Sequence, residues 1–388
     1  MNIAVFHNLP SGGALRMLRE KVKIFKKLSH RVHLFTFTTA EESLFPLKAL
    51  VDAWTVEPLN FRGPARFKNY LAASRRLAKK IDASGVDKIW VEKCRFVGSP
   101  SILRFLENPA DFYMQEPLRI RAYESLGKER SVGSTSSYSG PPLNAGEWFR
   151  KIFKVPAHFF IKREDRKSAL AARTVYTNSN FSAQWIKRVY GIEARVLYQS
   201  VDTDFFSPHG ATPENFVLSV GRLDITKGYD FLIEALSQVP KENQPALCVV
   251  CDAVNEHFKR RLQVMAAQKN VTLQIYTQVS DEVLRTLYQQ CAFVMCAATH
   301  EPFGLVPLEA MACEKPVLAV KEGGFPETIL DGETGYLLER NSALWAEKIG
   351  QLLADKPQRI RLGRAGRRHV LGRWTVQQMN GAIKKCLE

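Results

Sequence analysis

The sequence lacks the features that mark a membrane-spanning or secreted protein. No apolar run approaches the roughly 20 residues that a spanning helix needs, so no segment is predicted to cross a bilayer. The first residues, MNIAVFH, have neither the cationic region nor the apolar stretch of a signal peptide and are typical of a β-strand. We therefore expect a cytoplasmic location.

Disulfides and a thiolate metal site are not predicted either. The chain has seven cysteines, and an odd number in a long chain does not indicate a disulfide framework. Cys248 and Cys251 have C-x-x-C spacing, but they lie in the apolar run ALCVVCD, which is typical of a buried strand. Side chains three positions apart on a strand point to opposite faces, so the two thiols are expected to pack separately as small apolar groups.

Charge is unevenly distributed along this chain of 388 residues, which is long enough for two domains. Residues 1–200 hold 34 Lys and Arg against 17 Asp and Glu, a net charge of +17. Residues 201–388 hold the remaining 21 and 22, a net charge of −1. The cationic half is expected to bind phosphates on an anionic membrane surface, a phospholipid-like acceptor or a nucleic acid.

Strand and helix patterns alternate in both halves, which predicts an α/β protein with two doubly wound parallel sheets. The strand candidates of the first half lie at 3–7, 32–37, 88–92, 111–115, 174–179 and 195–199. Those of the second half lie at 216–220, 246–252, 271–276, 292–298 and 316–320. Turn-forming residues cluster at 200–214, so we predict domains at 1–200 and 201–372, followed by a closing helix at 373–388.

One segment departs from this alternation. Residues 125–150 are rich in Gly, Ser and Pro, and so long a loop inside a compact domain is usually functional or mobile. Residues 148–167 then mix phenylalanines with Lys and Arg. Two interpretations stay open, a helix whose aromatic side packs in the core and an interfacial segment that touches lipid headgroups.

Loops that leave the carboxyl ends of parallel strands are the candidate ligand sites. Gly12 and Gly13 follow the first strand and begin a helix, where backbone amides can approach a phosphate, although a plain tight turn explains them equally well. Arg222 and Lys227 flank a short loop of the second half. They are suited to clamp a diphosphate, or they are simply solvated cations.

The run HEPFGLVPLEAMACEKPVLA is the densest candidate. Glu301 lies in its loop and Glu309 in the opening turns of the next helix, with the amides of Phe303, Gly304 and Leu305 between them. One carboxylate with free amides suits the hydroxyls of a sugar, and a second carboxylate suits a ribose. The two acids could instead be a glycosidase pair, but the adjacent glycine loop and cations favour a bound diphosphate. A further glycine turn, at 322–327, follows the next strand.

These motifs together resemble the family-four retaining glycosyltransferases. The resemblance rests on VGRLDITKGYDFLIEAL, on the Glu-x7-Glu spacing in EPFGLVPLEAMACEKPVLA, on EGGFPETILDGETGYLL and on NSNFSAQWIKRVYGIEARVLYQSVDTDFF. It covers essentially the whole chain and is densest from 174 to 340. It implies the GT-B fold, in which two Rossmann-like domains face each other across a cleft and the C-terminal helix crosses back to the first domain.

The resemblance also implies roles for individual residues. A UDP- or GDP-sugar would bind the second domain, with Arg222 and Lys227 on its diphosphate and Glu309 on its ribose. Glu301 would hold the sugar together with the amides of Phe303, Gly304 and Leu305, while Val279 would lie by the base and Gly12 and Gly13 near the phosphates. The anomeric configuration would be retained, with no protein nucleophile, metal or cofactor.

The acceptor side would include Gln115, Glu116 and Arg119. Gln115 departs from the family, since relatives commonly have a histidine there that contacts the donor sugar, and a glutamine cannot become cationic. Donor choice and rate are the properties that this departure affects. Gln199, Cys251 and Ala297 also replace residues frequent in relatives, but none of them is an implied phosphate or ribose ligand.

The sequence thus predicts a transferase of a mannose-, glucose- or N-acetylhexosamine-class sugar. We expect a glycan or lipid-linked acceptor, a role in cell-envelope or surface polysaccharide (such as lipopolysaccharide) synthesis, and peripheral association with the inner face of the membrane. Alternatives are a nucleotide-sugar epimerase or hydrolase of the same fold, or a donor-binding pseudoenzyme. A nucleic-acid-binding protein is a further alternative, but no nucleic-acid partner is expected because no recognisable motif accompanies the basic half.

Overall fold

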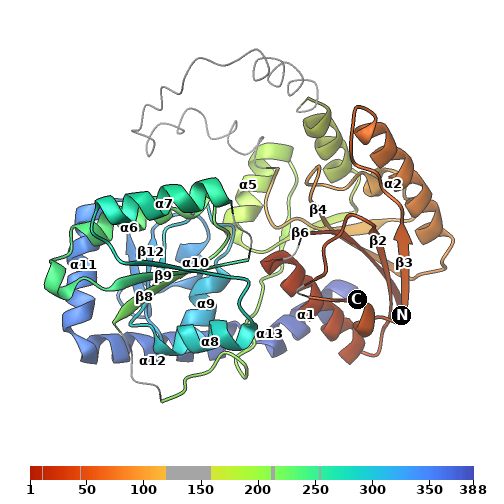
Figure 1. Ribbon diagram of the computed structural model, residues 1–388. Helices are drawn as coiled ribbons and strands as arrows, with labels where there is room; N and C mark the ends of the chain where they lie inside the picture. Colours follow the sequence, from red (N-terminus) through yellow and green to blue (C-terminus); the bar gives the residue numbers. More distant parts are fainter. Residues whose placement is uncertain (11, 44, 119–158, 211–214, 253–254) are drawn as a thin grey trace, which may run out of the picture. The chain divides into compact units, whose positions relative to one another are not determined.

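The computed structural model describes residues 1–388 except 11, 44, 119–158, 211–214 and 253–254 (Figure 1). The chain forms two compact units. The first consists of Met1–Asn178, Ser182–Leu197 and Ile383–Glu388, and the second of Ser179–Phe181 and Tyr198–Ala382. Across the described residues, no helix is long and apolar enough to cross a membrane.

The first unit contains a sheet of seven parallel strands in the order β3-β2-β1-β4-β5-β6-β7. Their bounds are β1 (Asn2–Asn8), β2 (Arg31–Phe37), β3 (Ala53–Glu57), β4 (Lys88–Cys94), β5 (Ala110–Tyr113), β6 (Thr174–Thr177) and β7 (Arg195–Val196). Its helices are α1 (Gly13–Lys27), α2 (Arg66–Asp82), a helix at 159–170 and α5 (Asn180–Tyr190), with 3-10 turns η1 (Lys48–Leu50) and η2 (Ser101–Arg104).

The second unit contains six parallel strands in the order β10-β9-β8-β11-β12-β13. Their bounds are β8 (Phe216–Val220), β9 (Ala246–Cys251), β10 (Leu273–Thr277), β11 (Val294–Cys296), β12 (Val317–Val320) and β13 (Gly335–Leu338). The helices are α6 (Tyr229–Ser237), α7 (Glu256–Gln268), α8 (Asp281–Gln290), α9 (Leu305–Ala312), α10 (Phe325–Thr328), α11 (Ser342–Ala354) and α12 (Lys356–Arg373), with 3-10 turns η4 (Ile225–Lys227) and η5 (Lys241–Asn243). The last helix, α13 (Val376–Leu387), begins in the second unit, and its residues from Ile383 on belong to the first.

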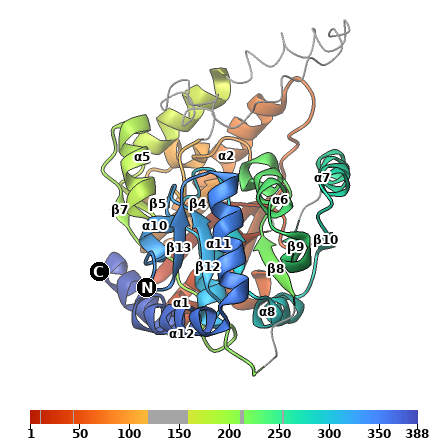
Figure 2. The same cartoon turned by 90° about the vertical axis from the view of Figure 1, so that its left-hand side faces the viewer.

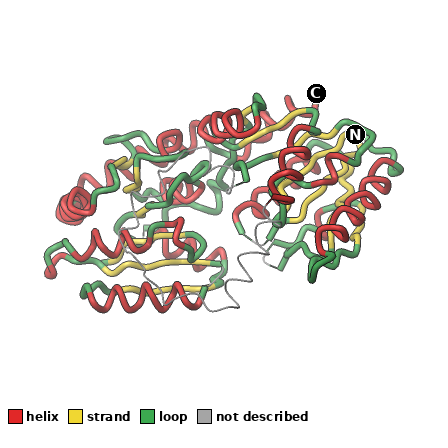
Figure 3. The backbone as a smooth tube through the Cα atoms, turned by 90° about the horizontal axis from the view of Figure 1, so that it is seen from above, coloured by secondary structure: helices red, strands yellow, loops and turns green. Residues whose placement is uncertain are grey.

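Each sheet lies between helices, which cover both of its faces (Figure 3). The sequence has apolar residues at helical spacing after the first strand, at Leu15, Leu18, Val22, Phe25 and Leu28, which predicts one buried face. The first four are buried in α1, whereas Leu28 follows the helix as its C-cap and is only partly buried. In the second unit α6 packs against α11, with the rings of Phe231 and Trp345 5.2 Å apart (Figure 2). The prediction of two doubly wound parallel sheets is therefore confirmed.

Two strands were not predicted from the sequence. β3 exposes Trp54 and so does not form a continuous apolar run. β13 begins at Gly335, a residue type that in a sequence usually indicates a turn. In the structure this glycine lies in a strand, and a Cβ there would lie 2.2 Å from the carbonyl oxygen of Val317. The glycine therefore permits a close approach of β13 to β12. The predicted strand at 195–199 is also shorter than expected, because only Arg195–Val196 pair with β6.

The two strand orders place the ligand-binding edge of each unit. All strands are parallel, but successive strands are added first on one side of β1 and then, from β4 on, on its other side. The same reversal of strand order occurs between β8 and β11 in the second unit. Loops that leave the carboxyl ends of strands at such a reversal are where ligands bind in open α/β sheets.

Cys248 and Cys251 lie buried in β9 as free thiols, as predicted.

Candidate functional site

Three loops at the carboxyl edge of the second sheet interlock through close backbone contacts. The backbone amide of Thr299, after β11, donates to the carbonyl of Thr226, after β8, at 2.8 Å. Gly228 has φ 69°, and a Cβ there would lie 2.3 Å from the carbonyl oxygen of Ala297. Because this approach and this φ both exclude a side chain, the glycine after Lys227 is required by the junction of the loops after β8 and β11.

The loop after β12 joins this junction through a second glycine. Gly323 has φ 63°, and a Cβ there would lie 2.5 Å from the carbonyl oxygen of Glu301. The backbone amide of Gly324 donates to the same oxygen at 2.8 Å. The predicted glycine turn at 322–327 therefore serves to seat the loop that carries Glu301.

Arg340, just after β13, ties the same loops together from the side. It donates to the carbonyl oxygen of Ala297 at 3.0 Å and forms an ion pair with Glu322, Nε to Oε1, at 3.1 Å. Sequence reasoning did not find Arg340. Its only signal was a basic residue after β13, a strand that was itself missed.

Lys227 and Glu301, two of the predicted catalytic residues, form an ion pair. Lys227 Nζ lies 2.7 Å from Glu301 Oε2, and each side chain is 21% exposed. Lys227 ends η4, whose N-cap Asp224 accepts from the backbone amide of Thr226 at 2.9 Å. The cation and the carboxylate are thus held at the loop surface, where an incoming ligand can reach both.

Arg222, in the same loop between β8 and α6, extends into solvent. Its side chain is 70% exposed, and its ion pair with Asp224 is long, 3.8 Å from Nε to Oδ2. An exposed guanidinium next to a lysine-bearing turn is suited to bind two phosphates at once. The structure therefore brings Arg222 and Lys227 together on one loop.

Glu309 is a buried carboxylate held by a tyrosine. It lies in α9, is 6% exposed, and its Oε2 accepts from the hydroxyl of Tyr288 at 2.7 Å. Burial of Tyr288 and the neighbouring Glu309 carboxylate raise the pKa of that phenol well above its usual value. The phenol thus stays protonated and donates to the carboxylate, which fixes the direction of Glu309. Sequence reasoning missed Tyr288, whose only signal was an aromatic residue on the apolar side of α8.

The start of α9 supplies backbone donors beside Glu301. Gly304 is the N-cap, with φ 106°, and the helix begins at Leu305. Amides in a first helical turn lack partners within the helix and lie at its positive end. Phe303 is buried against Trp374, with ring centroids 5.4 Å apart, which anchors the turn. Val279, after β10, packs at the margin of the core just before α8.

The remaining predicted residues belong to the first unit. Gly12 has φ 137° and is the N-cap of α1, which begins at Gly13, with no side-chain cap. Gln115 accepts from the hydroxyl of Ser182 at 2.9 Å through its backbone carbonyl, and Glu116 pairs with Lys93 at 3.0 Å. Arg119, residues 125–150 and residues 148–158 lie outside the described residues.

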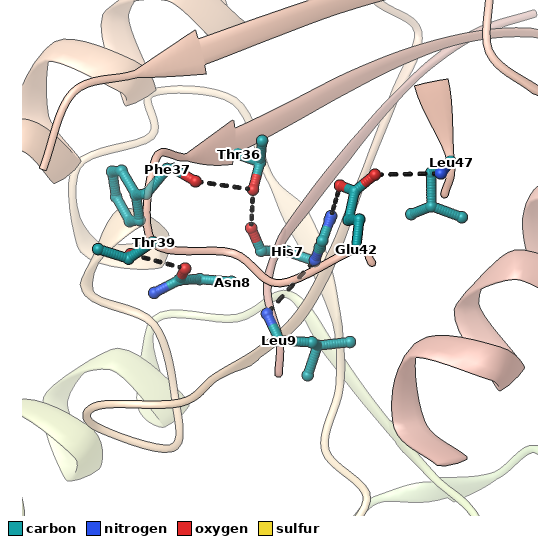
Figure 4. Close-up of polar contacts among 8 residues, drawn as sticks. All are labelled: His7, Asn8, Leu9, Thr36, Phe37, Thr39, Glu42 and Leu47. Carbon is teal, nitrogen blue, oxygen red and sulfur yellow. Dashed lines mark hydrogen bonds and ion pairs between the residues drawn. The ribbon is translucent and has the colours of Figure 1, made fainter. Parts of the chain in front are cut away.

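A polar network that the sequence did not predict surrounds the carboxyl end of β1 (Figure 4). The imidazole Nε2 of the fully buried His7 lies 2.8 Å from Glu42 Oε1, and the amide of Leu9 donates to His7 Nδ1 at 3.3 Å. Because Nδ1 accepts a hydrogen bond, Nε2 carries the ring proton and donates a hydrogen bond to Glu42 Oε1. The amide of Leu47 donates to the other oxygen of Glu42 at 3.0 Å.

This network acts on the carboxyl group of Glu42. Burial alone would raise the pKa of Glu42, but the hydrogen bonds from His7 and the Leu47 amide lower it below its usual value. Thr39, in the same loop, donates to Asn8 Oδ1 at 3.0 Å. The loop after β2 is thereby fixed to the end of β1.

Metal ligands are not gathered in the described part of the chain, where no group of three or more His, Cys, Asp or Glu side chains could hold an ion.

Comparison with known proteins shows which proteins the chain resembles. Residues 201–369 match the family model described as glycosyl transferases group 1. A D-inositol 3-phosphate glycosyltransferase from Xylanimonas cellulosilytica is 30% identical over 220 residues, in a match that covers 51% of this chain and 52% of that relative. The chain therefore spans about half the length of that curated relative.

Solved structures match along the whole chain. Sucrose-phosphate synthase from Thermosynechococcus elongatus superposes with a TM-score of 0.76 at 20% identity, covering 99% of this chain and 98% of that one. Anabaena HepE in complex with UDP and glucose superposes with a TM-score of 0.74 at 19% identity, covering 100% and 99%. These matches confirm the predicted GT-B fold.

Proposed function

We propose that the protein transfers a sugar from a nucleoside diphosphate sugar to an acceptor, and the match of residues 201–369 to the group 1 glycosyl transferases supports this proposal. The observation that carries the proposal is the set of loops at the carboxyl edge of the second sheet. There the Lys227–Glu301 pair, the exposed Arg222 and the buried Glu309 occupy one ligand-binding edge.

The donor binds by charge and by hydrogen bonding. Arg222 and Lys227 neutralise the diphosphate, and Glu309, oriented by Tyr288, accepts from ribose hydroxyls. Glu301 and the amides of Phe303, Gly304 and Leu305 hold the sugar, while Val279 lies by the base. The structure of HepE with UDP and glucose supports a uridine donor, and a guanosine donor is the alternative that the test below separates.

The chemistry requires stabilisation of charge. As the glycosidic bond to the diphosphate breaks, negative charge grows on the leaving phosphate and positive charge on the sugar. Lys227 stabilises the negative charge on the leaving phosphate, and Glu301, whose carboxylate lies 2.7 Å from Lys227 Nζ, stabilises the positive charge on the sugar. The acceptor hydroxyl attacks from the face that the diphosphate leaves and passes its proton to the diphosphate. This route retains the anomeric configuration and needs no metal, cofactor or protein nucleophile.

The acceptor is proposed to be a glycan or lipid-linked molecule that bears phosphate. The net charge of +17 in residues 1–200 supports an anionic acceptor and peripheral association with an anionic membrane on its cytoplasmic side. Gln115, Glu116 and Arg119 are the proposed acceptor-side residues. Such an enzyme would transfer a hexose or N-acetylhexosamine in the synthesis of a cell-surface polysaccharide such as lipopolysaccharide.

A thermal-shift panel of UDP, GDP, ADP and their common sugars tests this function. A ligand that binds only the folded state raises the melting temperature, so one nucleotide family should give a clear rise. Arg222→Ala and Glu309→Ala should abolish that rise. No shift with any nucleotide at millimolar concentration would sink the donor site, and release of free nucleotide at an equal rate without acceptor would indicate a hydrolase.

A further inference from the structure

We propose that the first unit docks on an anionic lipid surface through an aromatic rim at the starts of α2 and of the helix at 159–170. This inference rests on the proposed function and names the physical partner that carries the acceptor. The rim consists of Phe61, Phe67, Phe96, Phe159 and Phe160, with the cations Arg62, Arg66, Lys68, Arg95 and Arg163 around it. Figure 1 shows the two helices side by side beyond the first sheet.

Contacts between rings hold the rim together. Phe61 stacks on Phe96 with centroids 3.8 Å apart, and its ring lies 5.5 Å from that of Phe67. Phe67 in turn lies 4.4 Å from Phe160. The rim therefore joins the loops after β3 and β4 to the two helices, at the same carboxyl edge of the first sheet where ligands bind.

Phe159 extends this apolar cluster into solvent. It is 68% exposed, the largest fraction among the exposed large apolar side chains of the described residues. An exposed aromatic ring beside a basic helical face is the arrangement of a segment that lies at a membrane interface. Of the two interpretations of residues 148–167, the described part thus fits both, with Phe160 packed against Phe67 and Phe159 free to contact lipid.

The acids of the 159–170 helix face inward, so its outer face is positive. Asp165 is fully buried and accepts from the amide of Ser99 at 2.9 Å and from the hydroxyl of Tyr190 at 2.6 Å. Glu164 is buried in an ion pair with Arg104. The exposed charges that remain on this helix are Arg163, Arg166 and Lys167.

The start of α2 adds cations to the same rim. The guanidinium of Arg66 lies 5.0 Å from the centroid of the Phe67 ring, and that of Arg95 lies 5.8 Å from that of Phe96. Arg62 and Lys68 are exposed beside them. Arg95 is paired with Glu41 at 2.6 Å, whereas the one acid of α2, Asp82, lies at the opposite end of that helix. The net positive charge at the start of α2 therefore comes from Arg62, Arg66 and Lys68.

The rim fits a lipid surface better than a nucleic acid. Single-stranded nucleic acids bind by stacking bases on open aromatic faces. Phe61, Phe67 and Phe96 are already in contact with one another or with arginines, which leaves Phe159 alone to stack. A bilayer instead needs one apolar side chain to insert and several cations near the headgroups, and the rim supplies both.

Vesicle sedimentation with the full chain tests the proposal. The pair Phe159→Ser and Arg163→Glu removes one exposed apolar side chain and reverses one charge four residues away. Val264→Ser with Arg260→Glu on α7 makes the same changes at the same spacing in the second unit, where Val264 is 56% exposed. Vesicles of phosphatidylcholine alone and with phosphatidylglycerol serve as partners, at low and high salt.

The wild type should bind phosphatidylglycerol vesicles in a salt-sensitive manner and should bind neutral vesicles weakly. The rim variant should lose about tenfold or more of this binding, and the α7 variant should keep it. Equal loss in both variants, or no loss in the rim variant, overturns the proposal. So does competition by millimolar inorganic phosphate or glycerol 3-phosphate, or tighter binding of the rim to a single-stranded oligonucleotide than to vesicles.

Nucleotide thermal shifts on the same variants separate this inference from the proposed function. The rim variant should fold and keep the rise in melting temperature that the donor nucleotide produces. If that rise is absent in every variant and in the wild type, the donor site fails while vesicle binding can still stand. If the wild type and the rim variant both show the rise, and the rim variant binds vesicles as well as the wild type does, only the proposal of the rim is wrong.

Discussion

The two units have the same strand order around their reversal points, but they place charge in different ways. In the second unit the charged groups lie on interlocked loops at one edge, as in the Lys227–Glu301 pair at 2.7 Å. In the first unit a group of cations lies instead along α2 and the 159–170 helix. The comparison teaches that one topology can concentrate charged side chains on interlocked loops or distribute them along helices, as the two proposals above require.

The two units also contrast in the burial of one close lysine–glutamate pair in each. Lys21 and Glu92 of the first unit are 2.6 Å apart and almost completely buried, and Lys21 Nζ lies 3.1 Å from the centroid of the Tyr113 ring. Burial lowers the pKa of Lys21, although the Glu92 carboxylate opposes this shift. The Lys227–Glu301 pair remains partly exposed. The first pair therefore serves packing and the second is open to a ligand.

Lys21→Ala should give the largest effect, because it leaves Glu92 as an uncompensated buried charge. We expect a loss of about 3–5 kcal/mol in the stability of the first unit, measured by urea denaturation. The double variant Lys21→Met with Glu92→Leu should recover most of it, since a well-packed apolar pair replaces the ions. A cost below about 1 kcal/mol for Lys21→Ala would contradict the structural role of the pair.

Gly228→Ala should disturb the second unit by a smaller amount. Its Cβ would meet the carbonyl oxygen of Ala297 at 2.3 Å, and φ 69° is unfavourable for alanine. We expect a loss of about 1–3 kcal/mol together with weaker nucleotide binding, measured by thermal melts with and without nucleotide. Gly350→Ala in α11 is the matched control, since a Cβ there has nothing within 4 Å. It should be neutral or slightly stabilising.

Tyr288→Phe should affect binding more than folding. Loss of the 2.7 Å hydrogen bond removes the donor that orients one oxygen of the Glu309 carboxylate toward the proposed ribose. We expect nucleotide affinity to fall about tenfold in calorimetry, whereas affinity for a 2′,3′-dideoxy nucleotide should barely change. Tyr276→Phe, at an exposed tyrosine of β10, serves as the control and should bind like the wild type. Equal losses for both ligands would make Tyr288 a packing residue only.

The smallest effect concerns pH and the first unit. The folded state lowers the pKa of Glu42, so the contribution of this group is present above its ordinary pKa and is lost as pH falls through the lowered value. Thermal melts from about pH 6 to 3 should show a shallower acid decline in Glu42→Gln than in the wild type. Glu41→Gln, whose side chain is exposed beside Arg95, should leave the decline unchanged. A decline identical in all three proteins would rule out the His7–Glu42 contribution.

Local patterns in the sequence were sufficient for much of this protein. The spacing of Leu15, Leu18, Val22 and Phe25 predicted the buried face of α1, because helix periodicity depends only on neighbouring residues. Apolar runs bounded by turn formers likewise predicted most strands of both sheets. Local composition also pointed to Arg222, Lys227 and Glu301 in loops after strands and to Glu309 in the helix that follows, while the resemblance to a known family implied their roles.

What the sequence could not determine depends on segments that meet only after the sheets form. Tyr288 and Glu309 come from different helices, Arg340 reaches back to the loop of Ala297, and His7 meets Glu42 beyond the end of β2. β3 and β13 are stabilised by pairing with β2 and β12 rather than by a continuous apolar run. Sequence alone determined the two α/β units and the loops that bear charge. The tertiary structure decided which charges pair, which stay accessible and which tyrosine orients a carboxylate, because these contacts join residues that are distant along the chain.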